Sequence, residues 1–355
     1  MSSRLPLLLT GYGLPYTCGY IPLRDGSPNP RPWTPVDLVS AADRLGLSGV
    51  EVPLSTRVPS FDGREVVMPS YVEPLREALR QHAMIAAVDF GVLATQPLEE
   101  LLACLREAHR VGARVVRAII SNVLCGDRRT VPEGWRERLE ATAARLRQAI
   151  PLAADLGLCL AVENHQDATT EDLWWLQERA SAGFASAADA VGVTLDTGNP
   201  LAVGQDPVEA CRSLAPIIRH VHLKDYRLHE APAGYRLVRC AAGEGVVDFP
   251  AILGTLHEAG SRPQLAIEQA AQSARTIPLL DSGWWSTFAE RPATAWLPLL
   301  EVVWNRARPR TDDYRSPWEA DADAATVLDE EWQTLVRSVD YFRRLLASSP
   351  SKASP

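Results

Sequence analysis

The segment "IRHVHLKDY" at Ile218–Tyr226 suggests both a fold and a site. Side chains alternate between the two faces of a strand, so His220, His222 and Lys224 share one face. An apolar strand with three basic side chains on one face either meets solvent there or ends in a polar site. The ends of the other strands in the chain decide between these interpretations.

Seven further apolar runs alternate with amphipathic helical patterns. The predicted strands are 7–10, 49–53, 85–90, 115–120, 159–163, 192–196, 218–224 and 265–268, and the helical patterns include 35–46, 97–112, 135–157, 206–215 and 329–348. Thr34 followed by Pro35 is typical of a helix start, and Gly46, Gly112 and Gly157 are typical of helix ends. Eight strand–helix units in succession predict an α/β fold, the parallel (β/α)8 TIM barrel.

An open, doubly wound sheet is the alternative fold. Such a sheet carries a glycine-rich phosphate loop directly after its first strand. The corresponding sequence "TGYGLPYTCGY" has glycines without that spacing and without a clear helix behind them. The barrel is therefore favoured.

Composition limits the kinds of partner. The chain has 355 residues, is 46% hydrophobic and carries a formal net charge of −8, which argues against a nucleic-acid groove. No apolar run is long enough to span a membrane. The six cysteines are scattered and form no CxxC pair, which favours reduced thiols and a cytoplasmic location.

We expect one barrel domain over residues 1–348 and a disordered tail at 349–355. An insertion at about 270–327 lies between the eighth strand and the last helix and is rich in aromatic residues. It holds five tryptophans: Trp284, Trp285, Trp296, Trp304 and Trp318. They either pack the insertion against the barrel or a partner subunit, or cover the barrel mouth and stack on a sugar or aromatic ring.

Four consecutive predicted strands end in a potential metal ligand: Glu163, Asp196, His222 and Glu268. The C-terminal ends of parallel barrel strands share one rim, and a buried carboxylate is costly without a partner. We therefore expect a cation between them. Three carboxylates and one imidazole suit one divalent ion, Mn²⁺ first and Mg²⁺ or Co²⁺ as alternatives, better than a structural zinc.

Each of these residues also has a purely structural interpretation. A carboxylate at a strand end often caps a helix or forms an ion pair, the aspartate before "TGN" can form a turn, and a lone histidine can be hydrogen-bonded in a core. Their joint occurrence on four consecutive strands favours a site.

The strings "AVENH", "TLDTGN", "RHVHLKD" and "AIEQ", in this order and spacing, resemble the xylose-isomerase-like TIM-barrel family of sugar phosphate isomerases and epimerases. The resemblance covers about residues 5–270 and the terminal helix. It implies that Glu163, Asp196, His222 and Glu268 bind one divalent metal, as the matching positions do in ketose 3-epimerases. It also implies that Glu163 and Glu268 are the catalytic pair that moves protons.

Two positions depart from the 3-epimerase pattern. Those enzymes have a histidine three residues after the metal-binding aspartate, where this chain has Asn199. They have an arginine six residues after the metal-binding histidine, where this chain has Leu228 with Arg227 beside it. Asn199 also argues against the related endonucleases, whose three-zinc site uses more histidines.

The remaining candidates would contact substrate: His165, Asn199, Lys224, Arg227 and Glu51. His165 can instead orient a metal ligand or face solvent, and Glu51 can be structural. Arg117, in "VVRAII", either holds an anionic group or pairs with a carboxylate inside the barrel.

We therefore predict a metal-dependent sugar or polyol isomerase or epimerase. It would remove a proton next to a carbonyl through a metal-stabilised enediolate. The alternative is a lyase or dehydratase of the same family that cleaves a 3-keto glycoside, including a C-glycoside, by β-elimination. A phosphodiesterase or endonuclease and a non-catalytic accessory subunit rank below both. The expected partner is a small carbohydrate, with a homo-oligomer or a partner subunit as a further possibility.

Overall fold

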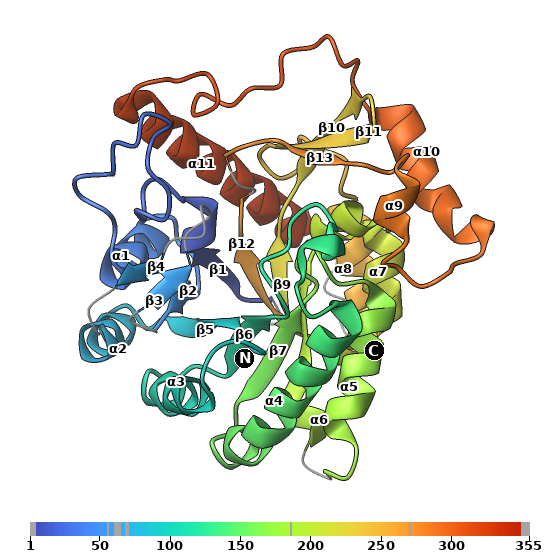
Figure 1. Cartoon of the computed structure of the whole chain (residues 1–355). Helices are drawn as coiled ribbons and strands as arrows, with labels where there is room; N and C mark the ends of the chain where they lie inside the picture. The colour runs from blue at the N-terminus through green and yellow to red at the C-terminus, as the bar shows by residue number, and fades with distance from the viewer. Residues whose placement is uncertain are drawn as a thin grey trace, which may run out of the picture.

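The computed structural model describes residues 5–54, 57–59, 65–67, 71–184, 187–269 and 272–348. Eight parallel strands close into a barrel in the order β1-β12-β9-β8-β7-β6-β5-β2 (Figure 1). They are β1 (Leu7–Thr10), β2 (Gly49–Pro53), β5 (Ile85–Val92), β6 (Val115–Ile119), β7 (Cys159–Glu163), β8 (Val191–Asp196), β9 (Ile218–Leu223) and β12 (Gln264–Ile267). The predicted TIM barrel is confirmed, and no predicted strand end differs by more than two residues.

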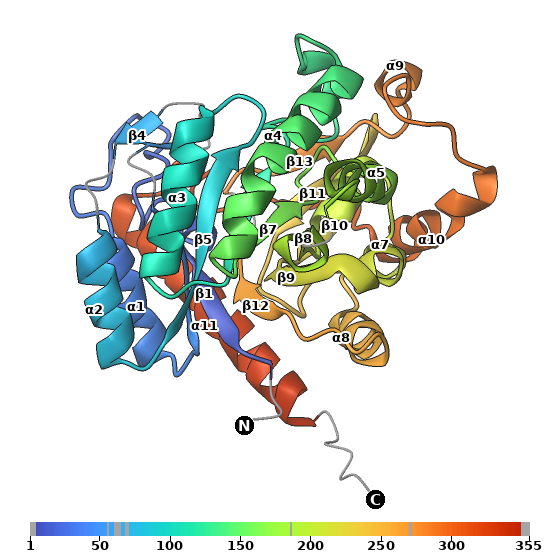
Figure 2. The ribbon, with the colours of Figure 1, turned by 90° about the horizontal axis from the view of Figure 1, so that it is seen from below.

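Helices surround the strands (Figure 2). They are α1 (Pro35–Arg44), α2 (Val72–Gln81), α3 (Leu98–Arg110), α4 (Trp135–Asp155), α5 (Thr170–Ser181), α6 (Ala187–Ala190), α7 (Pro207–Leu214), α8 (Phe249–Glu258) and α11 (Ala324–Ser348). Thr34 caps α1 by accepting a hydrogen bond from the backbone N–H of Asp37, with proline at the first helical position, as the sequence predicts. Short 3₁₀ helices are η1 (Gly11–Gly13), η2 (Arg128–Thr130), η3 (Asn199–Val203), η4 (Ala215–Ile217) and η5 (Ala293–Trp296).

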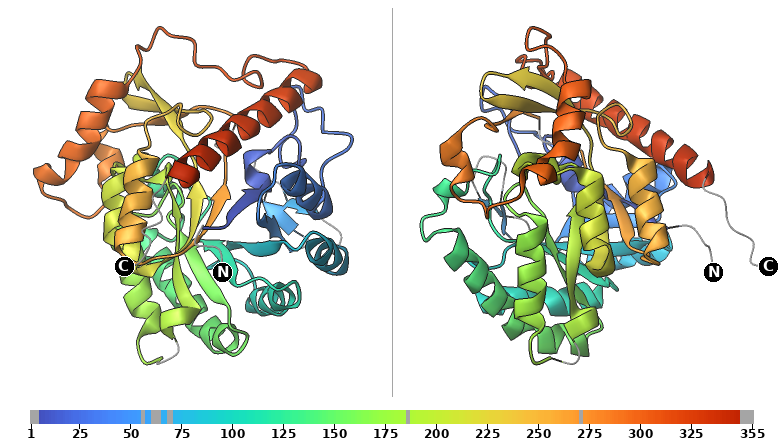
Figure 3. Two further views of the ribbon diagram at one scale, coloured as in Figure 1. Left: turned by 180° about the vertical axis from the view of Figure 1, so that it is seen from behind. Right: turned by 90° about the vertical axis from the view of Figure 1, so that its right-hand side faces the viewer.

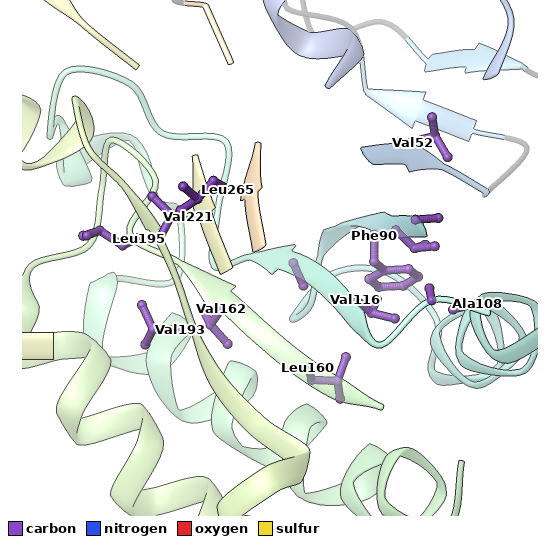
Figure 4. Close-up of a cluster of buried hydrophobic side chains, with 14 of the residues drawn as sticks. Val52, Phe90, Ala108, Val116, Leu160, Val162, Val193, Leu195, Val221 and Leu265 are labelled. Carbon is purple, nitrogen blue, oxygen red and sulfur yellow. The ribbon is translucent and has the colours of Figure 1, made fainter. Parts of the chain in front are cut away.

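The barrel strands carry two different faces. Outward side chains such as Val52, Val116, Leu160 and Val193 pack against the helices in the main apolar core (Figure 4). Inward side chains form a small apolar layer of Leu8, Ala87, Val115, Ala161 and Ala266. Two residues further along these five strands the residue is polar: Thr10, Asp89, Arg117, Glu163 and Glu268. The alternation of a strand therefore places the polar residues on top of a closed apolar floor.

A second sheet, absent from the predicted fold, follows β9 directly. It contains β10 (Tyr226–Ala231), β11 (Gly234–Arg239) and β13 (Arg275–Ile277), all antiparallel. The sheet packs with α9 (Ser282–Trp285) and α10 (Leu297–Arg306) in a separate apolar cluster (Figure 1). A two-stranded hairpin is formed by β3 (Arg57–Pro59) and β4 (Glu65–Val67).

The last helix, α11, joins two segments at the barrel mouth. It reaches from the loop after β1 toward α8 (Figure 3). The fully buried Glu331 accepts hydrogen bonds from the backbone N–H groups of Tyr16 and Thr17 and from the side chain of Gln272. One carboxylate thus ties the loop after β1 to the segment after β12.

The tail predicted at 349–355 lies outside the described residues. Within the part of the chain that the structure describes, no helix is both long and apolar enough to cross a membrane.

Candidate active site

The structure brings the four predicted metal ligands together. Glu163 and Asp196 end β7 and β8, His222 lies near the end of β9, and Glu268 follows β12. Ligand atoms of Glu163, Asp196 and His222 lie within 4.8 Å of one another, and Oε2 of Glu268 lies 2.8 Å from Nδ1 of His222. All four side chains are buried.

The two oxygens of Asp196 have different surroundings, and the structure shows the turn interpretation for one of them. Its Oδ1 accepts hydrogen bonds from the backbone N–H groups of Gly198 (2.8 Å) and Asn199 (3.0 Å), which form the turn. Its Oδ2 is left for the site. The side chain of Asn164 bonds both backbone polar groups of Asp196, so the ends of β7 and β8 are fixed to each other.

The Glu163 side of the site consists of Glu163, Arg117, Asn199 and Asp89. The guanidinium of Arg117 bonds Oε2 of Glu163 and lies 3.1 Å from Oδ1 of Asp89. The amide of Asn199 donates to Oε1 of Glu163 at 2.9 Å. Burial alone would raise the pKa of Glu163, but the positive charges of Arg117 and then His222 hold it below its usual value. Of the two roles considered for Arg117, the structure shows the ion pair.

The Glu268 side consists of Glu268, Lys224, Asp196 and His222. The ammonium of Lys224 forms ion pairs with Oδ2 of Asp196 (2.7 Å) and with Oε1 of Glu268. Burial would raise the pKa of Glu268, but Lys224 and His222 hold it well below its usual value. Burial raises the pKa of Asp196 to about 6, against the lowering effect of Lys224.

Arg117 and Lys224 require one correction to the prediction made from the sequence. That prediction expected a cation between the strand-end carboxylates and left open whether Arg117 pairs with one of them. The structure supplies two partners from the chain itself, Arg117 and Lys224. Lys224 shares the strand face of His222, so the pattern did contain this signal. The ion pairs lower the cost of burying the carboxylates before any metal binds.

Glu51 orients His222 from below the site. Its two oxygens lie 2.8 and 2.9 Å from Nε2 of His222, and Oε2 also lies 2.5 Å from Nε2 of His220. A carboxylate on one imidazole nitrogen fixes the ring and directs the other nitrogen, here Nδ1, toward Glu268. Glu51, predicted to contact substrate, is fully buried against the two histidines. With His220 and His222 it forms a second group whose ligand atoms lie within 4.8 Å.

The other predicted substrate contacts divide into two sets. His165 and Asn199 are at the site: Nδ1 of His165 and Oδ1 of Asn199 are buried and have no hydrogen-bond partner among the described residues. Burial lowers the pKa of His165 to about 4, which leaves its ring neutral at pH 7. Arg227 instead pairs with Glu244, because its neighbours Tyr226 and Leu228 point into the second apolar cluster.

Sequence reasoning missed three residues. Asp89 lies opposite Arg117 in the β5–β6 register, and a charge after the apolar "IAAV" was the available signal. His220 was visible in the opening segment but received no role. Asp167 accepts a hydrogen bond from the Ser121 hydroxyl, and burial raises its pKa to about 7.

The donor atoms fit a divalent cation. Oδ2 of Asp196, Oε2 of Glu268 and Nδ1 of His222 make ion contacts but no hydrogen bond of sound geometry within the described structure. Five buried carboxyl groups and three basic side chains line this part of the barrel: Glu51, Asp89, Glu163, Asp196 and Glu268 with Arg117, His222 and Lys224. Burial raises the pKa of Asp89 well above its usual value. Oxygen-rich ligands with one imidazole suit Mn²⁺ or Mg²⁺.

Three of the five tryptophans of the insertion pack against the barrel loops or one another, whereas Trp304 is 90% exposed. Trp284 is fully buried and donates its indole N–H to the backbone oxygen of Cys125 at 2.8 Å. The rings of Trp285 and Trp296 have centroids 4.2 Å apart, and a Cβ at Gly204 would lie 2.9 Å from Trp285. These contacts hold α9 against the loops that follow β6 and β8. Of the two interpretations of the insertion, packing against the barrel is therefore the one that Trp284, Trp285 and Trp296 show.

Comparison with known proteins places this chain in a family. Residues 39–283 match the model of the xylose isomerase-like TIM barrel. That region is more than half of the chain, and the chain therefore belongs to this family, as its strand-end motifs indicate.

Curated relatives include enzymes of several kinds. The chain is 30% identical to the rhizopine catabolism protein MocC of Rhizobium meliloti over 40% of this chain and 46% of that protein, so this match spans less than half of the relative. It is 28% identical to inosose dehydratase of Clostridium botulinum over 62% and 81% of the two chains. It is 23% identical to 3-oxo-isoapionate decarboxylase of Pectobacterium atrosepticum over 62% and 74%.

Solved structures share the fold at low identity. A D-psicose 3-epimerase structure matches 96% of this chain and 99% of its own, with a TM-score of 0.59 and 12% identity. A xylose isomerase-like TIM-barrel protein from Mycobacterium smegmatis in complex with magnesium matches 78% and 92%, with a TM-score of 0.53 and 18% identity.

Proposed function

We propose that this protein is a divalent-metal-dependent enzyme that removes a proton next to the carbonyl of a small carbohydrate or polyol. The observation that carries the proposal is the convergence of Glu163, Asp196, His222 and Glu268, three of which present a buried donor atom without a hydrogen bond among the described residues. These four would hold one ion, Mn²⁺ first and Mg²⁺ or Co²⁺ as alternatives. A neighbour of the same fold is named as a magnesium complex.

The residues of the site would take different roles in the reaction. A bound divalent ion would act as a Lewis acid toward the carbonyl oxygen. Glu268 would remove or return the proton; Lys224 contacts its Oε1, and its Oε2 accepts no hydrogen bond among the described residues. His165 and Asn199 offer buried polar atoms for substrate hydroxyl groups. Returning the proton to the opposite face of the same carbon is epimerisation, and returning it to the neighbouring carbon is isomerisation.

A lyase or dehydratase is the second candidate, and the asymmetry of the two glutamates favours it. Both oxygens of Glu163 accept hydrogen bonds, from Arg117 and Asn199, so Glu163 is held as a fixed group. Epimerisation with two bases needs Glu163 to move a proton as well, whereas elimination needs one base and a leaving group. Relatives named inosose dehydratase and 3-oxo-isoapionate decarboxylase agree with this second outcome. A 3-keto glycoside remains a candidate substrate.

Proton exchange tests both candidates together. The purified protein would be assayed for bound metal and then incubated in deuterated water with Mn²⁺ and a panel of ketoses, inososes and 3-keto glycosides. We expect about one metal per chain and deuterium at the carbon next to the carbonyl of one substrate class. Products then separate the reactions, since only elimination releases a leaving group. Absence of exchange with every metal and substrate would overturn the proposal.

We also propose a cytoplasmic location for the protein. All six cysteines are free thiols, and five of them are buried: Cys18, Cys104, Cys159, Cys211 and Cys240. Free thiols are typical of a reducing compartment.

A further inference from the structure

The basic residues of this chain are almost all arginines. The sequence contains 34 arginines and two lysines among its 36 basic residues, and the lysines are Lys224 and Lys352. Lys352 lies outside the described residues, so Lys224 is the one described lysine. Arginine supplies positive charge everywhere else in the described structure. The one described lysine therefore lies in the site, where a compact ammonium differs from the planar, forked guanidinium of arginine.

The structure shows where that ammonium lies. Nζ of Lys224 is 2.7 Å from Oδ2 of Asp196 and is also in contact with Oε1 of Glu268. The side chain is 7% exposed. One small charge thus joins two carboxylates that come from different strands.

The backbone and the stem of Lys224 are held in place. Its backbone N–H donates to the hydroxyl of Thr197 at 2.9 Å, and that hydroxyl donates to its carbonyl oxygen at 2.8 Å. A Cβ at Gly198 would lie 3.3 Å from Cγ of Lys224 and 2.8 Å from the ring of Tyr226. The glycine leaves room for the lysine stem, so the ammonium reaches the carboxylates without displacing the turn.

The carboxylates that hold the ammonium are also two of the proposed metal ligands. The ammonium and the proposed ion would share Oδ2 of Asp196 and would contact different oxygens of Glu268. Two positive charges on the same two carboxylates would repel each other in a buried site. Arg117 is different: it pairs with Glu163 and Asp89, and Asp89 lies outside the proposed ligand set. Competition for the metal ligands therefore falls mainly on Lys224.

We propose that the ammonium of Lys224 takes the place of a metal ion in the metal-free protein. There it holds Asp196 and Glu268 together, and it moves off at least one of them when a divalent metal binds. Lys224 thereby stabilises the empty barrel mouth and weakens metal binding. This inference rests on the proposed metal site. It assigns Lys224 a positioning role toward that site rather than the substrate contact expected from the sequence alone.

Metal titration of Lys224→Met tests the competition. We expect Mn²⁺ to bind the variant about tenfold more tightly than wild type in isothermal titration calorimetry, because no ammonium has to be displaced. The metal-free variant should melt at a lower temperature, since two buried carboxylates lose their partner. Saturating Mn²⁺ should close that gap in melting temperature.

Two further variants serve as controls. Arg138→Met removes another buried cation, which pairs with Glu133 outside the site; it should lower the melting temperature and leave Mn²⁺ affinity unchanged. Lys224→Arg keeps the charge but supplies a fork that can bond both carboxylates, and it should bind Mn²⁺ more weakly than wild type.

A second measurement needs no variant. A limiting amount of an amine-specific acylating reagent would label wild-type protein with and without Mn²⁺, and peptide mass spectrometry would compare the two lysines. Displacement predicts faster labelling of Lys224 with Mn²⁺ and an unchanged rate at Lys352, which is the internal reference.

The outcomes separate this inference from the proposed function. If wild type binds Mn²⁺ and Lys224→Met binds it equally or more weakly, the ammonium does not compete and the inference fails while the metal site stands. Labelling of Lys224 that stays constant or slows with Mn²⁺ would lead to the same conclusion. If neither protein binds a divalent metal, the proposed metal site fails as well.

Discussion

The two sides of the site hold the same residue type in different ways. On the Glu163 side, Arg117 and Asn199 occupy both oxygens of the glutamate. On the Glu268 side, Lys224 contacts Oε1, while Oε2 lies beside His222 without a sound hydrogen bond in the described structure. Two glutamates at equivalent strand ends therefore need not share a role. Glu163 is held by the guanidinium of Arg117 and the amide of Asn199, whereas Oε2 of Glu268 accepts no hydrogen bond among the described residues.

The largest expected effect is on the Glu268 side. Glu268→Gln removes the proposed proton-transfer group, so deuterium exchange into substrate should fall by about a hundredfold to ten-thousandfold. The fold should persist, as measured by circular dichroism. Glu301→Gln, an exposed change on α10, is the matched control. Substantial remaining exchange on the true substrate would remove Glu268 from this role.

On the Glu163 side, the main expected effect is on stability. Arg117→Met leaves Glu163 and Asp89 buried without their cation, which should cost about 3–5 kcal/mol of unfolding free energy in the metal-free protein. Chemical denaturation measures this. Arg129→Met breaks exposed ion pairs with Asp127 and Asp281 and should change the unfolding free energy far less, because exposed ion pairs are screened by solvent. Equal costs for the two variants would contradict the buried-pair account.

Two substitutions around His222 should lower metal binding by different amounts. His222→Ala removes a proposed ligand and should strongly lower metal occupancy, measured by elemental analysis. Glu51→Gln keeps the ligand but loosens its orientation, and should lower metal affinity by about 10- to 100-fold. Unchanged occupancy in His222→Ala would take the histidine out of the ligand set.

The smallest expected effect concerns Asp167 on the loop after β7. Burial raises its pKa to about 7, so the folded state holds this proton more tightly than the unfolded state. Its contribution to stability is complete below about pH 4 and is lost as pH rises through about 7. Wild type should therefore lose stability relative to Asp167→Asn as pH rises over that range, measured by thermal unfolding. A stability difference that does not change with pH would exclude the buried carboxyl as its cause.

Much of the fold could be predicted because its signals are local. Strand and helix periods, the cap at Thr34 and the glycines at Gly46, Gly112 and Gly157 each depend on a few neighbouring residues. All three glycines have positive φ angles, of 57°, 80° and 65°. The hairpin of β10 and β11 was missed, although Tyr226, Leu228, Tyr235 and Leu237 alternate with polar residues there.

The sequence by itself determined the barrel, the family and the four strand-end residues that meet at one rim, because strand alternation and parallel topology fix which positions point inward. Only the tertiary structure decided the partners. Arg117 reaches Glu163 across neighbouring strands, and Lys224 joins Asp196 to Glu268. Such pairings depend on register and on side-chain length across the barrel, which no local pattern encodes, and they make the two glutamates different.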